Sequence, residues 1–281
     1  TRDYKKQKEI GIKRVTIKEA FEHFKKVNTN KNPKTIGDYD RFYKKFSAGF
    51  DENLPCSSIN KLNVENWLME IKKLDFALNT IHGYGKQLTH FLNFLFEYSY
   101  TQMFKINREV KTRAEVKEKV IFSEADFSKI MHNLKKKNSN FVTTINLLAY
   151  TGLRPSDLMT INAADIDLRN RTMKYYSPKR KKFREIKYKE KLVSILRKRI
   201  KEVRQGLLLD YNSTENFGRA IKRYLEVLNL NDKKYSARTF RKTFITLCRS
   251  RYNMDASIVR ELVGHAHGNT MDRFYNKIEL T

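Results

Sequence analysis

A tyrosine near the end of this 281-residue chain follows a series of basic side chains that together could act on a phosphodiester. The tyrosine is Tyr275, and the basic residues upstream of it are Arg154, Lys179, Arg241 and His265. A phenolic oxygen can displace a sugar oxygen from phosphorus when fixed groups neutralise the charge that builds up there. These residue types therefore favour a metal-free attack on a nucleic-acid backbone.

The charge of the whole chain favours the same kind of partner. The chain has 58 Lys and Arg residues against 31 Asp and Glu residues, a formal net charge of +27. Such an excess predicts a polyanionic partner and binding that weakens as salt rises, because counterions are released. A ribosomal protein or a lysine-rich proteome would show a similar excess, so the charge indicates nucleic acid without selecting a reaction.

Arg154 follows directly after a predicted buried helix, 141–150, that ends at Gly152. A side chain at such a junction is presented on a rigid platform, and a guanidinium there can hold two phosphate oxygens. A surface arginine paired with Asp157 is the alternative. Arg238 and Arg241 stand three positions apart on another predicted helix, so both project from one side of it. That pair suits an anion, although a solvated basic face would tolerate it.

Lys179 lies on a basic turn between two predicted strands, 172–176 and 183–188. A lysine at a hairpin tip could protonate a leaving hydroxyl, whereas a turn that only holds the DNA backbone would have the same composition. His265 follows a glycine after the predicted helix 255–263. A structural hydrogen bond is the commoner role of such a histidine, and a bond to a phosphate oxygen is the alternative.

The pattern of apolar residues predicts a chain that is mainly α with a small antiparallel β element. A helical bundle is expected first, with helix starts at Thr16, Asn32-Pro33, Asn63 and about Asn79. Ser123 is expected to begin the first helix of the second part. Later helices are expected around 190–204, 214–229, 236–250, 255–263 and 270–276.

Composition also predicts where the domains divide. Residues 105–119 are charged and poor in large apolar groups, which indicates a linker, with an exposed helix of the bundle as the alternative. We therefore expect an N-terminal helical domain at 1–104, a linker at 105–121 and a second domain at 122–281. Because the chain begins at Thr1 rather than Met, a further domain before it stays open.

Cys56 and Cys248 match no metal-ligand spacing, so buried, reduced thiols in a cytoplasmic protein are expected. No apolar run reaches the length of a membrane helix, and the N-terminus lacks the apolar core of a signal peptide.

Taken together, these segments resemble the tyrosine recombinase family, the integrases of phages and conjugative elements. The family's two arginine boxes match TGLRPSDL (151–158) and FRKTFIT (240–246). Its Leu-Gly-His motif matches ELVGHA (261–266), and its nucleophile region matches FYNKI (274–278). Order and spacing agree over 122–281. The resemblance implies a helical core-binding domain followed by a mixed α/β catalytic domain.

The resemblance also implies a role for each residue. Arg154, Arg241 and His265 would bind the non-bridging oxygens of the scissile phosphate. Tyr275 would attack and form a 3′-phosphotyrosyl link, and Lys179 would protonate the departing 5′-hydroxyl. No metal or other cofactor is expected, since the phosphotyrosyl bond keeps the energy of the broken linkage.

The choice of the general acid follows from the same match. Lys179 precedes the Arg184-Glu-Ile segment by the family's usual interval, and Lys181 is the second choice. Asp157 falls where the family has an acidic residue that supports the site. Arg238 stands where the family usually has a histidine, and an arginine cannot shuttle protons near neutral pH.

The alignment leaves one further alternative. One extra residue separates His265 from Tyr275, and an alignment without a gap would put Phe274 in the place of the nucleophile. The match of the residues after Tyr275 favours an insertion in the loop.

The resemblance thus implies a site-specific recombinase or integrase of a mobile element. It would act on double-stranded DNA as a homotetramer, through a Holliday junction, in the cytoplasm and on the nucleoid. Accessory DNA-bending proteins of the host or the element are candidate partners. A relaxing topoisomerase of the IB type and a catalytically impaired, architectural DNA-binding relative are the alternatives.

Overall fold

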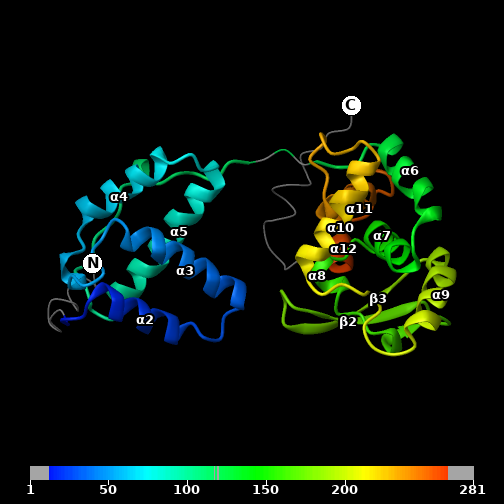
Figure 1. Ribbon diagram of the computed structural model, residues 1–281, viewed down its shortest axis with the longest axis horizontal. Coiled ribbons are helices and arrows are strands. Elements are labelled where there is room, and N and C mark those ends of the chain that lie inside the picture. The colour runs from blue at the N-terminus through cyan, green and yellow to red at the C-terminus, as the bar shows by residue number, and fades with distance from the viewer. Residues whose placement is uncertain (1–12, 117, 119, 265–281) are drawn as a thin grey trace. The chain divides into compact units, whose positions relative to one another are not determined.

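The computed structural model describes residues 13–116, 118 and 120–264. The chain divides into two compact units, unit 1 (Thr1–Lys117) and unit 2 (Glu118–Thr281), and each is described by itself (Figure 1). The described residues are mainly helical, with one three-stranded antiparallel sheet in unit 2, which confirms the predicted fold class. None of the helices in these residues is both long enough and apolar enough to span a membrane.

The described part of unit 1 is helical. Its elements are α2 (Ile17–Val27), α3 (Pro33–Ser47), η1 (Cys56–Ser58), α4 (Lys61–Lys73), α5 (Leu78–Glu97) and η2 (Arg108–Val110). Thr16 and Asn32 begin α2 and α3 as predicted, because their side chains accept hydrogen bonds from the main-chain N–H groups of Glu19 and Lys34.

The predicted start of α4 at Asn63 is wrong by three residues. Asn60 is the N-cap, and its side-chain oxygen accepts from the Asn63 main-chain nitrogen at 3.0 Å. The Asn63 side chain in turn accepts from the Asn60 nitrogen at 2.9 Å. Two asparagines three positions apart thus satisfy each other's main-chain donors, so the second one is inside the helix.

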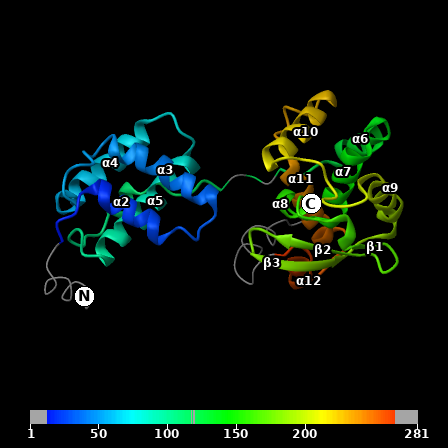
Figure 2. The same ribbon diagram turned by 60° about the horizontal axis from the view of Figure 1, so that its bottom comes forward.

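Helix α5 is the centre of the bundle, and it carries apolar residues on nearly every side. It contacts α2, α3 and α4, among which it lies in Figure 2. Its fully buried Phe91 has ring contacts with Phe21, Phe24, Phe42 and Phe46, at centroid distances from 5.5 to 6.1 Å.

Part of the segment that composition indicates as a linker lies along unit 1. The main-chain nitrogen of Asn107 donates to the Glu65 carboxylate at 2.7 Å. Asn79 and Glu115 exchange two hydrogen bonds through the Asn79 side chain and the Glu115 main chain, at 3.0 and 3.3 Å. These contacts use main-chain groups of the segment, so its charged side-chain composition could not predict them.

Unit 2 combines helices with the sheet. Its helices are α6 (Glu124–His132), α7 (Ser139–Thr151), α8 (Pro155–Leu158), α9 (Val193–Val203), α10 (Thr214–Val227), α11 (Ala237–Ser250) and α12 (Ala256–Val263). Short 3-10 turns are η3 (Asn133–Lys136), η4 (Ala163–Asp165) and η5 (Glu190–Leu192). Ser123 caps α6 as predicted. The helix expected at 270–276 lies outside the described residues.

The sheet has the order β1-β2-β3, with β1 (Ile166–Asp167), β2 (Thr172–Ser177) and β3 (Lys182–Lys187). Strands β2 and β3 are the two predicted strands, and they pair antiparallel with Tyr175 opposite Arg184. The two-residue strand β1 is too short to give a sequence pattern.

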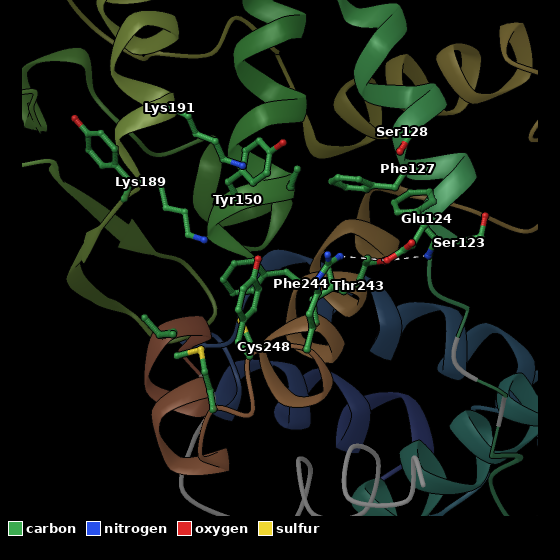
Figure 3. A pocket seen from close by; sticks show the side chains of 18 of the residues that line it. Ser123, Glu124, Phe127, Ser128, Tyr150, Lys189, Lys191, Thr243, Phe244 and Cys248 are labelled. Atoms are coloured by element: carbon green, nitrogen blue, oxygen red, sulfur yellow. Dashed lines mark hydrogen bonds and ion pairs between the residues drawn. The ribbon is translucent and has the colours of Figure 1, made fainter. Parts of the chain in front are cut away.

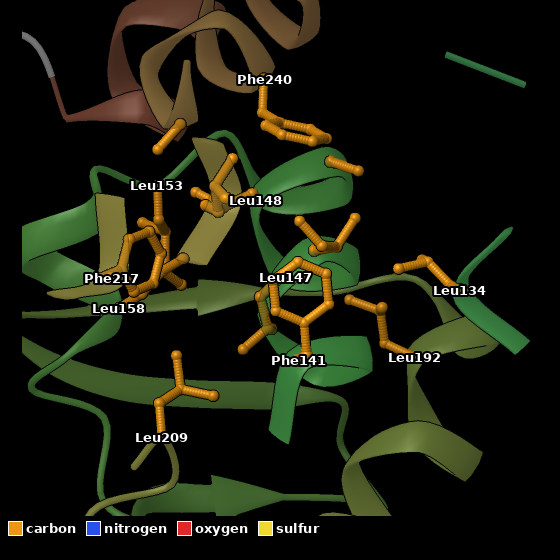
Figure 4. Close-up of a cluster of buried hydrophobic side chains, with 14 of the residues drawn as sticks. Leu134, Phe141, Leu147, Leu148, Leu153, Leu158, Leu192, Leu209, Phe217 and Phe240 are labelled. Atoms are coloured by element: carbon orange, nitrogen blue, oxygen red, sulfur yellow. The ribbon is translucent and has the colours of Figure 1, made fainter. Parts of the chain in front are cut away.

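Helix α7 forms the centre of unit 2 and fixes the chain just before the site. Leu147 and Leu148 are fully buried in the cluster shown in Figure 4. The helix ends at Gly152, which has a φ of 61°. A Cβ there would overlap the Phe244 ring of α11, so only glycine allows this close approach of α11 to the end of α7.

A buried carboxylate holds the loop before α11. The Asp126 carboxylate accepts hydrogen bonds from Lys233 at 2.8 and 3.1 Å and from the Tyr235 hydroxyl at 2.7 Å. The bond from Lys233 is the main cause that lowers the pKa of Asp126 to about 2. Cys56 and Cys248 are buried free thiols, as predicted.

Candidate active site

Arg241 ties two helix ends together. It lies on α11 and is only 8% exposed. Its Nη1 donates to the Gly152 carbonyl at the end of α7 at 2.6 Å, and its Nη2 donates to the Val263 carbonyl at the end of α12 at 2.7 Å. The last carbonyls of a helix carry partial negative charge and have no partner inside it, so a buried guanidinium is stable there.

Arg154 approaches the same end of α12 from another side. It precedes Pro155 at the N-cap position of the short helix α8. Its Nη2 donates to the Gly264 carbonyl at 3.3 Å, while its Nη1 contacts the Asp157 carboxylate at 3.4 Å. The guanidinium groups of Arg154 and Arg241 therefore meet at adjacent carbonyls. Arg154 thus contacts Asp157 and also donates to the carbonyl next to the one that Arg241 binds.

Asp157 connects this arginine to the sheet. Its side chain is 1% exposed. The Ser177 hydroxyl at the end of β2 donates to its Oδ1 at 3.1 Å, and Oδ2 faces Arg154. An almost fully buried carboxylate between a guanidinium and a hydroxyl is fixed in orientation, so Asp157 limits the rotamers of Arg154.

The hairpin places Lys179 in a turn, as the sequence predicts. Ser177 pairs with Lys182, which leaves residues 178–181 as the loop. The loop contains a turn closed by the bond from the Arg180 nitrogen to the Ser177 carbonyl at 3.0 Å, and Lys181 has a φ of 52°. Lys179 and Lys181 are both exposed, so their positions do not select one of them as the proton donor.

Arg238 and Arg241 have different surroundings despite their spacing. Arg238 is exposed in the first turn of α11, whereas Arg241 is buried against main-chain carbonyls. Their spacing alone therefore does not make the two arginines a single anion site, because Arg241 donates to the carbonyls of Gly152 and Val263 whereas Arg238 is exposed.

The sequence of unit 2 matches a known protein family. The phage integrase family matches residues 121–280, more than half of the chain. The chain belongs to the phage integrase family. It is thereby a tyrosine-type site-specific DNA recombinase, as its sequence motifs indicate. No curated protein sequence matches this recombinase.

Solved structures similar to this recombinase share its fold. The Tn1549 transposon integrase in complex with circular intermediate DNA has a TM-score of 0.75 at 16% identity, covering 95% of this chain and 96% of that one. A lambda integrase dimer bound to a COC′ core site has a TM-score of 0.71 at 14% identity, covering 95% and 81%. XerH recombinase bound to difH has a TM-score of 0.70 at 18% identity, covering 92% and 80%.

The remaining motif residues of this recombinase, His265 and Tyr275, lie outside the described residues, as does Phe274. Among other tyrosines, burial raises the pKa of Tyr224 to about 12 and also raises that of Tyr175. A buried phenol of raised pKa is a poor nucleophile. Tyr252 is 58% exposed, so it serves as the comparison for Tyr275.

Two residues of the site were missed in the sequence. Arg184 on β3 donates from Nη2 to the Glu261 carbonyl at 2.6 Å. Tyr175, opposite it on β2, is 1% exposed, and its hydroxyl has no hydrogen-bond partner in the described part of the chain. Tyr175 and Arg184 are opposite each other in the hairpin, so their side chains lie on the same face of the sheet. This register is the signal that would have found both residues.

A separate cavity of about 760 Å³ lies on another side of α11 (Figure 3). Phe244, Tyr150 and the lysines Lys189 and Lys191 are among its lining residues. The Lys191 ammonium lies 3.0 Å from the centre of the Tyr150 ring, and burial lowers the pKa of that lysine. Neither Arg154 nor Arg241 lines this cavity. In the described residues, no cluster of His, Cys, Asp or Glu could hold a metal ion.

Proposed function

We propose that the chain cleaves and rejoins double-stranded DNA at specific sites through a 3′-phosphotyrosyl intermediate. The observation that carries this proposal is the convergence of Arg154 and Arg241 on the carbonyls of Gly264 and Val263. In the sequence His265 follows Gly264 directly, so the two arginines bind the residues that precede this motif histidine. The Tn1549 and lambda integrases, which share the fold, are seen bound to DNA.

The arginines supply the charge that the reaction needs. Attack on a phosphodiester develops negative charge on the two non-bridging oxygens, and guanidinium donors fixed beforehand stabilise it without reorganisation. The Arg154 side chain is 17% exposed, so some of its N–H donors can reach a phosphate while its Nη1 contacts Asp157. His265 is proposed as a further donor to the same oxygens.

The proposed step breaks one ester and forms another. The Tyr275 oxygen bonds to phosphorus, the bond from phosphorus to the 5′-oxygen breaks, and that oxygen takes a proton from the Lys179 ammonium. The Tyr275 proton passes to water, because Arg238 replaces the usual histidine and cannot accept it. Rejoining is the reverse step with a 5′-hydroxyl of the partner strand. The number of phosphate esters is unchanged, so no nucleotide is consumed.

Strand exchange requires more than one copy of the chain. We propose that a homotetramer holds two DNA sites and exchanges strands through a Holliday junction, with accessory DNA-bending proteins as further partners. The lambda integrase of similar fold is seen as a dimer on its core site. The formal charge of +27 supports extensive contact with the DNA backbone.

A nicked DNA substrate tests the proposal. Duplexes that bind the chain are first selected from random sequences, and a nick next to the cleavage position then lets the short 5′-hydroxyl fragment diffuse away and traps the adduct. We expect a covalent adduct that survives denaturation, made by the wild-type chain and not by Tyr275→Phe. Binding without any adduct would instead support an architectural relative, which Arg238 favours. Relaxation of plasmids of any sequence would support a topoisomerase.

A further inference from the structure

Arg184 connects the β2–β3 hairpin to the C-terminal end of α12. It lies on β3, and its Nη2 donates to the Glu261 carbonyl at 2.6 Å. The guanidinium also lies against Gly264, where a Cβ would overlap its Nη1. Gly264 has a φ of 66°, so glycine is favoured both by the backbone and by the arginine above it.

The same helix end accepts hydrogen bonds from two other arginines. Arg241 of α11 donates to the Val263 carbonyl, and Arg154 before α8 donates to the Gly264 carbonyl. Three guanidinium groups from three elements therefore donate to carbonyls in the last turn of α12, where partial negative charge gathers. The Glu261 carbonyl also accepts from the Gly264 main-chain nitrogen at 3.1 Å. Of the three, Arg184 is the one that belongs to the hairpin with Lys179.

The hairpin is attached to the site at two places. At the end of β2, the Ser177 hydroxyl donates to Asp157 at 3.1 Å, next to Arg154. Strand β3 has only one buried residue, Ile186, so packing holds it weakly. Besides the antiparallel pairing of β3 with β2, the bond from Arg184 to Glu261 ties β3, and with it the loop 178–181, to α12.

We propose that Arg184 is a positioning residue that sets the distance between Lys179 and the phosphate held by Arg154 and Arg241. The proposal rests on the proposed function, in which the Lys179 ammonium gives its proton to the 5′-oxygen. A direct bond from Arg184 to the DNA backbone is the competing role. The 2.6 Å bond to a main-chain carbonyl and the contact with Gly264 favour positioning.

A change of leaving group separates these roles. In one nicked substrate the 5′-bridging atom is oxygen, and in the other it is sulfur. A thiol has a pKa of about 8.5, far below that of an alcohol, so a thiolate leaves without a proton donor. Loss of proton donation therefore slows cleavage of the oxygen substrate and leaves the sulfur substrate nearly unaffected.

We expect Arg184→Ala to slow cleavage of the oxygen substrate by about 10- to 100-fold at saturating DNA, which is within the range of general-acid effects. Cleavage of the sulfur substrate should stay within about threefold of the wild-type rate. Lys179→Ala should show the same pattern. Lys187→Ala is the control, because it removes an equal charge from an exposed position of the same strand and should change neither rate.

Hydrogen exchange of the hairpin amides gives a readout that does not depend on activity. Exchange at residues 179–182 should be faster in Arg184→Ala than in the wild-type chain, with exchange in α7 unchanged. Arg184→Lys keeps the charge and one donor for Glu261, so it should recover part of the lost rate. Unchanged exchange in α7 shows that Arg184→Ala still folds.

Several results would overturn the proposal. If Arg184→Ala cleaves the oxygen and sulfur substrates more slowly by the same factor, Arg184 acts on the phosphate or on the fold. If Lys179→Ala alone is rescued by sulfur, positioning by Arg184 is wrong and the proposed function stands. A loss of DNA affinity with an unchanged rate at saturation would make Arg184 a backbone contact. If the wild-type chain forms no adduct with either substrate, the proposed function and this proposal both fail.

Discussion

Arg154 and Arg241 donate to the carbonyl oxygens of consecutive residues, Gly264 and Val263, at 3.3 and 2.7 Å. The two arginines come from different segments of unit 2, before α8 and within α11. Their meeting at the end of α12 gives the site two fixed cations at the chain position that precedes His265. This relationship gives Arg241 a structural role beside its proposed catalytic one, and the structural role can be tested by unfolding.

Arg241→Lys should destabilise unit 2, whereas Arg238→Lys should not. A lysine cannot donate to Gly152 and Val263 at once, and a buried carbonyl left without a donor costs about 1–3 kcal/mol in the free energy of unfolding. Because Arg238 is exposed, Arg238→Lys should lower the free energy of unfolding by less than about 0.5 kcal/mol. Urea unfolding followed by circular dichroism measures both. The single tryptophan, Trp67, reports on unit 1 and should show an unchanged midpoint.

Gly152→Ala should destabilise unit 2 for two reasons that a second variant can separate. The new Cβ overlaps the Phe244 ring, and a φ of 61° strains any residue with a Cβ. The total cost is about 1–3 kcal/mol or more in the free energy of unfolding. In a Phe244→Ala background the overlap is gone and only the strain remains, so the two changes should not add. Additive costs would contradict the close contact.

Asp157→Asn should reduce cleavage more than DNA binding. The carboxylate orients Arg154, and loss of its charge weakens a charge-assisted hydrogen bond worth about 1.5–3 kcal/mol. If that energy is expressed in the transition state, cleavage slows by about 10- to 100-fold. Ser177→Ala, which leaves the charge in place, should have a smaller effect. The measurements are the rate of adduct formation at saturating DNA and the affinity for DNA. If Asp157→Asn lowers the affinity by the same factor as the rate, the carboxylate does not act by orienting Arg154.

The pH dependence of stability should reflect Asp126. Its pKa is lowered from 3.8 to about 2 in the folded chain, chiefly by the hydrogen bond from Lys233. A lowered carboxyl pKa stabilises the folded state above pH ~4, and this contribution is lost as pH falls through about 4 to 2. Asp126→Asn should therefore be less stable than the wild-type chain at neutral pH, with a gap that narrows in acid. If the difference in the free energy of unfolding between the two chains stays the same from pH 2 to 6, the ion pair of Asp126 and Lys233 does not stabilise the fold.

Local sequence signals predicted the parts of the site that depend on local structure. The glycine that ends α7, the basic hairpin turn and the cap of α6 each depend on residues a few positions away. The burial of Arg241 and the exposure of Arg238 depend instead on where α7 and α12 lie against α11. Arg184 shows the same limit, because its acceptor, Glu261, is brought near only by the tertiary fold.

The N-terminal errors have a similar origin. Asn63 has the residue type of an N-cap, but Asn60 has it too, and only the reciprocal bonds decide between them. The charged segment before unit 2 is fixed to α5 through its main chain, which composition does not describe.

The most direct measurement of the central claim is the identity of the residue that becomes attached to DNA. The trapped adduct is digested with trypsin and nuclease, and mass spectrometry locates the residual nucleotide. Cleavage after Arg273 and Lys277 isolates residues 274–277, which contain one tyrosine. We predict the nucleotide on Tyr275, loss of the adduct in Tyr275→Phe and an unchanged adduct in Tyr252→Phe. A nucleotide on any other residue, or an adduct that persists in Tyr275→Phe, would contradict the proposed mechanism.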